Sequence, residues 1–219
     1  MKYTNENGRS MVEMLGVLAI IGVLSVGGIA GYSKAMNKYK INKTTDQVSM
    51  LVANIRTIFS AQGDYEGLTN LTAKKFGVVP NDMYSSTSNS TITNAFGGAV
   101  TIAAAPGRAS TDKEAFSITY AGISSEACVT IATGDWGSGQ ASGLIAVAAS
   151  VAGKSKTAVE AILTGQSSGN HVTGVAGSAT AAVVGVPGGT TIGTPIPVAK
   201  AVDACACTGS TCEVAWKYY

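Results

Sequence analysis

The most strongly apolar uncharged stretch of the chain lies near its beginning. It runs for twenty residues, Met14–Ser33, between Glu13 and Lys34. As an α-helix, twenty residues span roughly 30 Å, the thickness of the hydrocarbon core of a bilayer. The apolar side chains of Leu15–Ile29 fall on every face of such a helix. The pattern therefore predicts a helix that lipid or other helices must surround.

The hydrophobic pattern takes a different period further along the chain. Apolar residues recur there at intervals of three and four, at Val48, Leu51, Val52, Ile55, Ile58 and Phe59. This spacing is typical of an amphipathic helix that is packed on one side. We expect one helix from about Met11 to about Gln62, ended by Gly63. Its second half should pack on a globular head.

From Asp64 onwards, the pattern predicts a head made of short strands and short helices. The expected helices are Leu71–Gly77, Ser124–Gly134 with Ser124 as N-cap, Thr157–Leu163 and Pro197–Ala204. The expected strands are a hairpin within Thr91–Ile102, then Ala115–Tyr120, Leu144–Val151 and Glu213–Tyr219. The small-residue segment Gly165–Gly193 should form loops with weak strands. The aromatic residues of the last strand are expected to pack in a core or an interface: Trp216, Tyr218 and Tyr219.

The composition argues against several classes of protein. Of the 219 residues, 46% are apolar and only 13% are charged, about half the usual charged share, whereas a disordered chain needs the opposite balance. The net charge of +2 gives no sign of nucleic-acid binding. The single histidine, His171, excludes a multi-histidine metal site and argues against a Ser-His-Asp triad. Gly153–Ser155 resembles the end of a phosphate-binding loop, but Ala148 stands where its leading glycine is required. We therefore expect neither an enzyme nor a cofactor.

Four cysteines offer two kinds of chemistry: Cys128, Cys205, Cys207 and Cys212. They allow three disulfide pairings, and the residues alone leave the choice open. Cys205 and Cys207 are too close in sequence to pair easily, so Cys128 must reach one of the three C-terminal cysteines. The alternative is a thiolate metal site, since the last three are closely spaced. An exported chain in an oxidising compartment favours disulfides over metal.

Two ordinary interpretations of the N-terminal segment meet difficulties. A secretory signal peptide needs a basic start, but two acidic residues balance the two basic ones in Met1–Glu13; its cleavage site would be Gly28–Ala30. A plain membrane anchor leaves Glu13 unexplained. The lysines that follow would favour a cytoplasmic side for the rest of the chain, in conflict with the cysteines: Lys34, Lys38, Lys40 and Lys43. We expect these lysines to face solvent or another subunit.

The segment Asn7–Leu15 resembles the processing site of type IV pilins and pseudopilins. In that family a prepilin peptidase cuts after a glycine and leaves glutamate as the fifth residue of the mature chain. A cut after Gly8 makes Glu13 the fifth residue, and Val17–Leu24 is similar to the family's apolar helix nearly position for position. The first mature residue would be Arg9, where the family usually has an aromatic or aliphatic residue.

The resemblance implies a fold and a division of the chain. The fold would be the α+β pilin fold, a long hydrophobic helix packed on an antiparallel sheet with short helices and a C-terminal disulfide loop, most similar to the type IVb branch and conjugative thin-pilus pilins. The implied disulfides are Cys128–Cys205 and Cys207–Cys212. The implied regions are a leader, an assembly helix, its amphipathic continuation and a head: residues 1–8, 9–33, 34–62 and 63–219.

The resemblance also implies a function and partners. The chain would be a subunit that is inserted in the bacterial inner membrane, processed by the peptidase and polymerised by the assembly machinery into a surface filament for adhesion, conjugation or aggregation. No nucleic acid is among the expected partners. The alternatives are a pseudopilin of a secretion system and an ordinary anchored or secreted binding domain.

Glu13 has a physical role in such a filament. A carboxylate buried among apolar helices costs several kcal/mol unless it is paired. After cleavage, Arg9 would carry an α-ammonium and a guanidinium, and in a helical stack these would reach Glu13 of a neighbour and fix the axial register. The simpler interpretation is that Glu13 marks the membrane interface. Glycines further along the helix either permit close packing or weaken it so that it extends on assembly: Gly27, Gly28 and Gly31.

Overall fold

The structure is a computed structural model, and it divides into two units, Met1–Tyr39 and Lys40–Tyr219. The residues that it describes are 11–85, 90–137, 142–162, 172–173, 182–187, 192–207 and 211–219. Each unit is treated by itself below. The second unit contains the head and the part of the long helix that packs on it.

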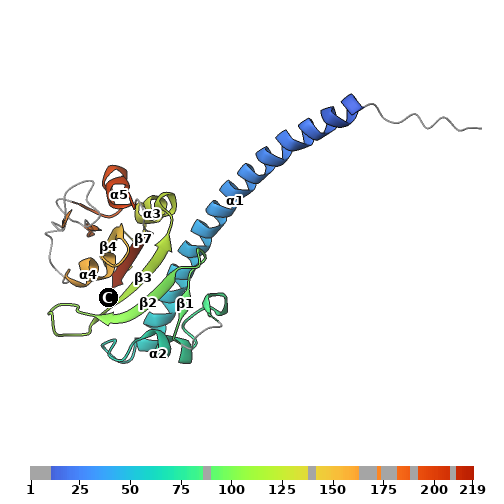
Figure 1. The fold of residues 1–219 in the computed structure, drawn as a ribbon. Helices are drawn as coiled ribbons and strands as arrows, with labels where there is room; N and C mark the ends of the chain where they lie inside the picture. Colours follow the sequence, from blue (N-terminus) through green and yellow to red (C-terminus); the bar gives the residue numbers. More distant parts are fainter. Residues whose placement is uncertain are drawn as a thin grey trace, which may run out of the picture. The chain divides into compact units, whose positions relative to one another are not determined.

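The long N-terminal helix, α1, runs from Met11 to Phe59 (Figure 1). Its side chains are exposed from Met11 to Ala35, and buried ones begin at Thr44. The predicted stripe is buried against the head except at Ile58, which is exposed. The helix ends three residues before the expected Gln62, and Gly63 follows in the left-handed conformation with φ 62°. The Ser60 hydroxyl donates to the carbonyl of Thr57, which competes with a further helical turn.

In the described residues, the head is built on one antiparallel sheet of seven strands in the order β1-β2-β3-β7-β4-β6-β5. The last strand of the chain, β7, therefore lies in the centre, between β3 and β4 (Figure 1). The strands are β1 Ile92–Thr93, β2 Ala99–Ala105, β3 Ala115–Ile123, β4 Leu144–Val151, β5 Val172–Thr173, β6 Ala182–Gly185 and β7 Cys212–Tyr218. The expected hairpin and the three other expected strands are confirmed.

The two faces of the sheet carry different cores. On β7, Val214, Trp216 and Tyr218 lie in the large core beneath α1. Ala215 lies in the small core on the opposite face, where Val159 of α4 covers the sheet. Because side chains alternate along a strand, a central strand buried on both sides reads as a nearly continuous apolar run.

The part of the head that the structure describes has five short helical elements around the sheet: α2 Asn70–Lys75, the 3₁₀ helix η1 Asn81–Met83, α3 Ser125–Ala132, α4 Ser155–Glu160 and α5 Val198–Ala204. Ser124 is the N-cap of α3, as expected, since its hydroxyl accepts the amide N–H of Ala127. Thr69 caps α2 with a complete capping box. The helix expected at Thr157–Leu163 instead begins two residues earlier, at Ser155.

Helix α4 is held at both ends by β7. At its start, the Glu213 carboxylate accepts the backbone N–H groups of Gly153 and Lys156. At its end, the Lys217 ammonium donates to the carbonyls of Glu160 and Ile162. An acid therefore meets the positive end of the helix dipole and a base meets its negative end. These contacts explain why a fully buried strand face carries two charged residues.

Candidate assembly helix and stapled head

The first half of α1 carries an apolar surface with no covering in the single chain. Among the described residues, α1 is the one helix long and apolar enough to cross a membrane, and no part of its apolar 18-residue window is buried. The exposed large side chains are Met11, Val12, Met14, Leu15, Val17, Leu18, Ile20, Ile21, Val23, Leu24, Val26 and Ile29. A contiguous apolar surface of this size marks an interface with lipid or with other protein.

Glu13 is an acidic residue at the edge of this surface. It lies in the first turn of α1, and its side chain is exposed. An acid in the first turn is favourable because the helix dipole is positive there. Gly8 and Arg9, expected as the processing site and as the partner of Glu13, lie outside the described residues.

The glycines of this helix half have no packing role in the single chain. A Cβ atom added at Gly27, Gly28 or Gly31 would meet no atom within 4 Å, and the same holds for Gly16 and Gly22. Crowding within the subunit therefore does not require glycine at any of these positions. Close packing would need another helix beside this one, whereas the weakening of the helix is intrinsic to glycine and needs no partner.

The second half of α1 is joined to the head by Asp82. Lys43 Nζ lies 2.9 Å from Asp82 Oδ2, and Gln47 Nε2 donates to the same oxygen at 3.0 Å. Partial burial raises the pKa of Asp82, but the hydrogen bonds and charge of these partners outweigh it and leave the pKa below its ordinary value. Lys43 was expected on a face toward solvent or another subunit, and the structure instead gives it a partner in η1. The sequence holds no local signal for this contact, because Asp82 is distant in the chain.

Arg56 connects α1 to the end of β7. Its Nε donates to the carbonyl of Tyr219 at 3.1 Å, and its guanidinium lies 5.2 Å from the centre of the Tyr218 ring. Gly143 makes room for it, because a Cβ atom at that position would lie 2.2 Å from Arg56 Nη2. Arg56 thereby holds the second half of α1 to the end of β7.

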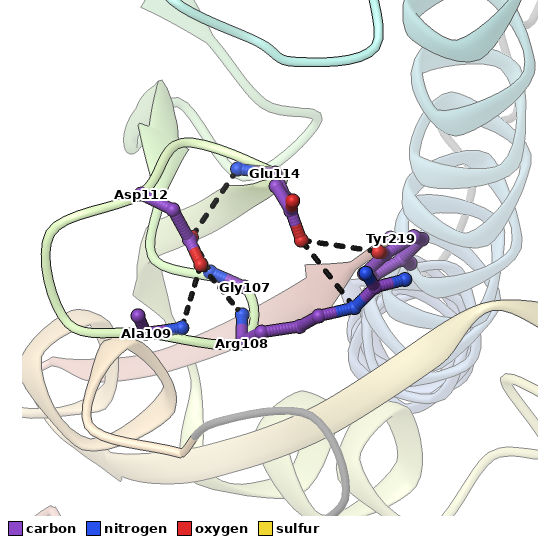
Figure 2. Close-up of polar contacts among 6 residues, drawn as sticks. All are labelled: Gly107, Arg108, Ala109, Asp112, Glu114 and Tyr219. Atoms are coloured by element: carbon purple, nitrogen blue, oxygen red, sulfur yellow. Dashed lines mark hydrogen bonds and ion pairs between the residues drawn. The ribbon is translucent and has the colours of Figure 1, made fainter.

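A polar loop between β2 and β3 is organised by one carboxylate (Figure 2). Asp112 accepts the backbone N–H groups of Gly107, Arg108, Ala109 and Glu114. The bonds from Gly107 and Ala109 contribute most, and together the four lower the pKa of Asp112 to about 2. Asp112 therefore stays ionised, and keeps these four hydrogen bonds, at any pH well above that value.

The same loop holds the end of the chain (Figure 2). Tyr219 donates its hydroxyl to the Glu114 carboxylate at 3.1 Å, and Arg108 lies 3.5 Å from that carboxylate. The Arg108 guanidinium lies 5.6 Å from the centre of the Tyr219 ring. Tyr219 is thus held from the loop and, through its carbonyl, by Arg56.

The four cysteines form two disulfides. Cys128 of α3 is joined to Cys205 at the end of α5, across 77 residues, and Cys207 is joined to Cys212 at the start of β7, across five. This is the pairing that the family resemblance implies. The sulfurs of Cys128, Cys205 and Cys212 all lie within 4.8 Å of one another. They are disulfide sulfurs and not thiolates, whereas a metal ion binds thiolates.

The remaining residues singled out in the sequence have structural surroundings. The Ser155 hydroxyl is buried and bonded to the Ser150 hydroxyl and to the carbonyl of Glu213, and the Gly153 N–H donates to the Glu213 carboxylate. The protein itself therefore occupies these two groups of the motif. Trp216 and Tyr218 are buried in the large core, as expected. His171 lies outside the described residues.

A comparison with families of known proteins finds a match. The family model described as "PilS N terminal" matches residues 38–186 of this chain. The match covers more than half of the chain and includes most of the head.

Two curated relatives have the same name, "Major structural subunit of bundle-forming pilus", and come from Escherichia coli O127:H6 (strain E2348/69 / EPEC) and Escherichia coli O111:H-. Each is 28% identical over 130 residues, which is 58% of this chain and 64% of the relative. The match thus spans somewhat less than two thirds of the length of these relatives.

A solved structure shares the architecture. The crystal structure of TcpA, a type IV pilin from Vibrio cholerae El Tor biotype, aligns with a TM-score of 0.51 at 19% identity and covers 83% of this chain and 99% of TcpA. At this identity the likeness concerns the fold alone. The long apolar helix, the antiparallel sheet and the disulfide from the middle helix to the C-terminal segment are features of this chain's own structure. The fold is the α+β pilin fold, and the chain belongs to the PilS family.

Proposed function

We propose that this chain is the structural subunit of a type IV pilus, which polymerises into a surface filament. The single observation that carries the proposal is the unburied apolar half of α1, with Glu13 in its first turn. The head, by contrast, buries its apolar side chains in its own two cores. The names of the two curated relatives, both pilus subunits, support the same function. The job of the filament would be adhesion, conjugation or aggregation.

The proposed assembly follows from the chemistry of the helix. The leader, residues 1–8, is removed by a prepilin peptidase after Gly8, and the subunit waits in the inner membrane with Met14–Ser33 in lipid. In the filament, other copies of α1 replace the lipid. Glu13 then leaves a polar environment, and the cations of Arg9 of a neighbour offset the cost of burying it. The assembly is therefore a homo-oligomer in which one ion pair sets the stagger of the apolar helices.

This proposal assigns no catalytic step to the chain. Its polar clusters, Asp112 with the loop amides and Asp82 with Lys43, are fully engaged in holding elements of the head together. The work of the subunit is mechanical and depends on how well the copies adhere.

The test uses the full chain produced together with a prepilin peptidase and a pilus assembly system. The expected mass of the exported protein corresponds to a chain that begins at Arg9. A chain that begins at Gly31 would show an ordinary signal peptide, and a chain that retains Met1 would show an ordinary anchor. Electron microscopy of surface material then separates a long pilus from a short secretion filament.

A matched pair of variants tests the register. Glu13→Ala should insert in the membrane normally but lose most filament yield, because the neighbour's cation is left without its partner. Asp46→Ala removes an exposed acid from the same helix beyond the apolar stretch and should leave the yield unchanged. A normal yield from Glu13→Ala would refute the register argument.

A further inference from the structure

The two disulfides differ in how open they are to outside reagents. Cys207 is half-buried. Its partner Cys212 and both members of the other bridge, Cys128 and Cys205, have no exposed surface. Cys207 is therefore the one cysteine of the four that keeps exposed surface, and a dissolved thiol would approach the bridges from its side. Attack at the Cys207 sulfur would release Cys212 as a thiolate inside the head.

The released sulfur would lie beside the second bridge. The sulfurs of Cys212, Cys128 and Cys205 are within 4.8 Å of one another, and Cys212 Sγ also lies 3.3 Å from the carbonyl oxygen of Cys205. Cys207 does not belong to this cluster of three. Thiol–disulfide exchange requires a thiolate close to a disulfide sulfur, and here the sulfurs are already neighbours in the folded state.

We propose that Cys207 is a thiol-exchange site, and that Cys212 passes the exchange to the buried Cys128–Cys205 bridge without unfolding of the head. The thiolate of an external thiol bonds to Cys207 Sγ, the Cys207–Cys212 bond breaks, and Cys212 leaves as a thiolate. That thiolate then bonds to the sulfur of Cys128 or Cys205, the bond between them breaks, and the other sulfur leaves as a thiolate. The number of disulfide bonds is conserved in each step.

The consequence concerns how this chain acquires its cross-links. Four cysteines allow three pairings, and the exchange lets a nearly folded head sort among them at one place. The partner is a thiol of low molecular weight or a thiol–disulfide isomerase that reacts at Cys207. The proposal is independent of filament formation.

The test compares two variants that each leave one free thiol. Cys207→Ala leaves Cys212 inside the cluster, and Cys212→Ala leaves Cys207 outside it. Each full-length protein is held in detergent at pH 7 to 9, quenched in acid, labelled on its free thiol and mapped by mass spectrometry. In Cys207→Ala we expect the label to spread from Cys212 to Cys128 or Cys205 within hours, to roughly one tenth or more of the molecules and faster at higher pH. In Cys212→Ala we expect it to stay on Cys207.

Two further measurements show that the head is folded and that each label can be detected. Tryptophan fluorescence of the same samples reports that the head is folded, and a sample in denaturant shows that every label position can be detected. A label that stays on Cys212 in folded Cys207→Ala, or that spreads equally in both variants, would overturn the proposal. If a variant does not fold, the unmodified protein in glutathione buffer tests both steps. Glutathione should attach first to Cys207, and the free thiol should then be found on Cys128 or Cys205 as well as on Cys212. First attachment elsewhere, or a free thiol on Cys212 alone, would refute the proposal.

Discussion

Lys217 is an amine at the centre of the sheet with no exposed surface. Burial lowers its pKa from 10.5 to about 8, against the opposing charges of Glu160 and Asp112. Between these two values the unfolded chain binds more protons than the folded one, so the free energy of unfolding should rise with pH, by at most about 1.4 kcal/mol per pH unit. Above pH 10 the trend should reverse. Burial raises the pKa of Tyr218 to about 12 and raises the pKa of Tyr120 even more, so these tyrosines lose their protons in the unfolded chain before they do in the folded one.

Chemical denaturation of the full chain in detergent, followed by tryptophan fluorescence at pH 7.5 to 10, tests this expectation. The variant Lys217→Met keeps an unbranched side chain only one heavy atom shorter and removes the titrating group. Its stability should lack the rise above pH 8. If the variant and the unmodified protein give parallel pH profiles, Lys217 is not the group responsible.

At the scale of elements, the loop between β2 and β3 depends on a single side chain. Asp112 accepts four backbone N–H groups, and Asp112→Ala leaves all four without that acceptor. We expect the amides of Gly107, Arg108, Ala109 and Glu114 to exchange with deuterium at least several-fold faster in the variant, while those of β3 keep their protection. Thr111→Ala, an exposed neighbour in the same loop, is the control. Unchanged exchange in Asp112→Ala would mean that the loop is ordered by other contacts.

The elements also show where the sequence suffices and where it does not. Helix α3 was predicted closely, because its N-cap Ser124 and its apolar spacing are local signals. Helix α4 was misplaced by two residues, because its start is held by Glu213, which is 57 residues away from Lys156 in the chain. The central place of β7 depends on pairing with β3 and β4, which periodicity cannot reveal. Contacts such as Lys43–Asp82 are hidden for the same reason.

At the scale of the whole molecule, more of the N-terminal apolar helix than of the head could be predicted from the sequence. An apolar run of membrane length needs no tertiary partner to be recognised, so Met14–Ser33 and Glu13 stand out by themselves. The head requires contacts between distant segments: its C-terminal strand is central, and its middle helix is tied to its C-terminal segment by Cys128–Cys205. The surfaces by which heads would bind a receptor have no such mark in either the sequence or the described residues.

The two bridges should therefore contribute unequally to the stability of the head. In the chain-entropy model, a bridge that closes a loop of 77 residues stabilises by about 4 kcal/mol, and one that closes five residues by about 2 kcal/mol. The double variant Cys128→Ala/Cys205→Ala should accordingly lose about twice as much unfolding free energy as Cys207→Ala/Cys212→Ala, measured by denaturant titration in detergent. Helicity of the first half of α1 should be the same in both, because the bridges lie in the other unit. Equal losses would mean that native-state packing, and not loop closure, sets what each bridge contributes.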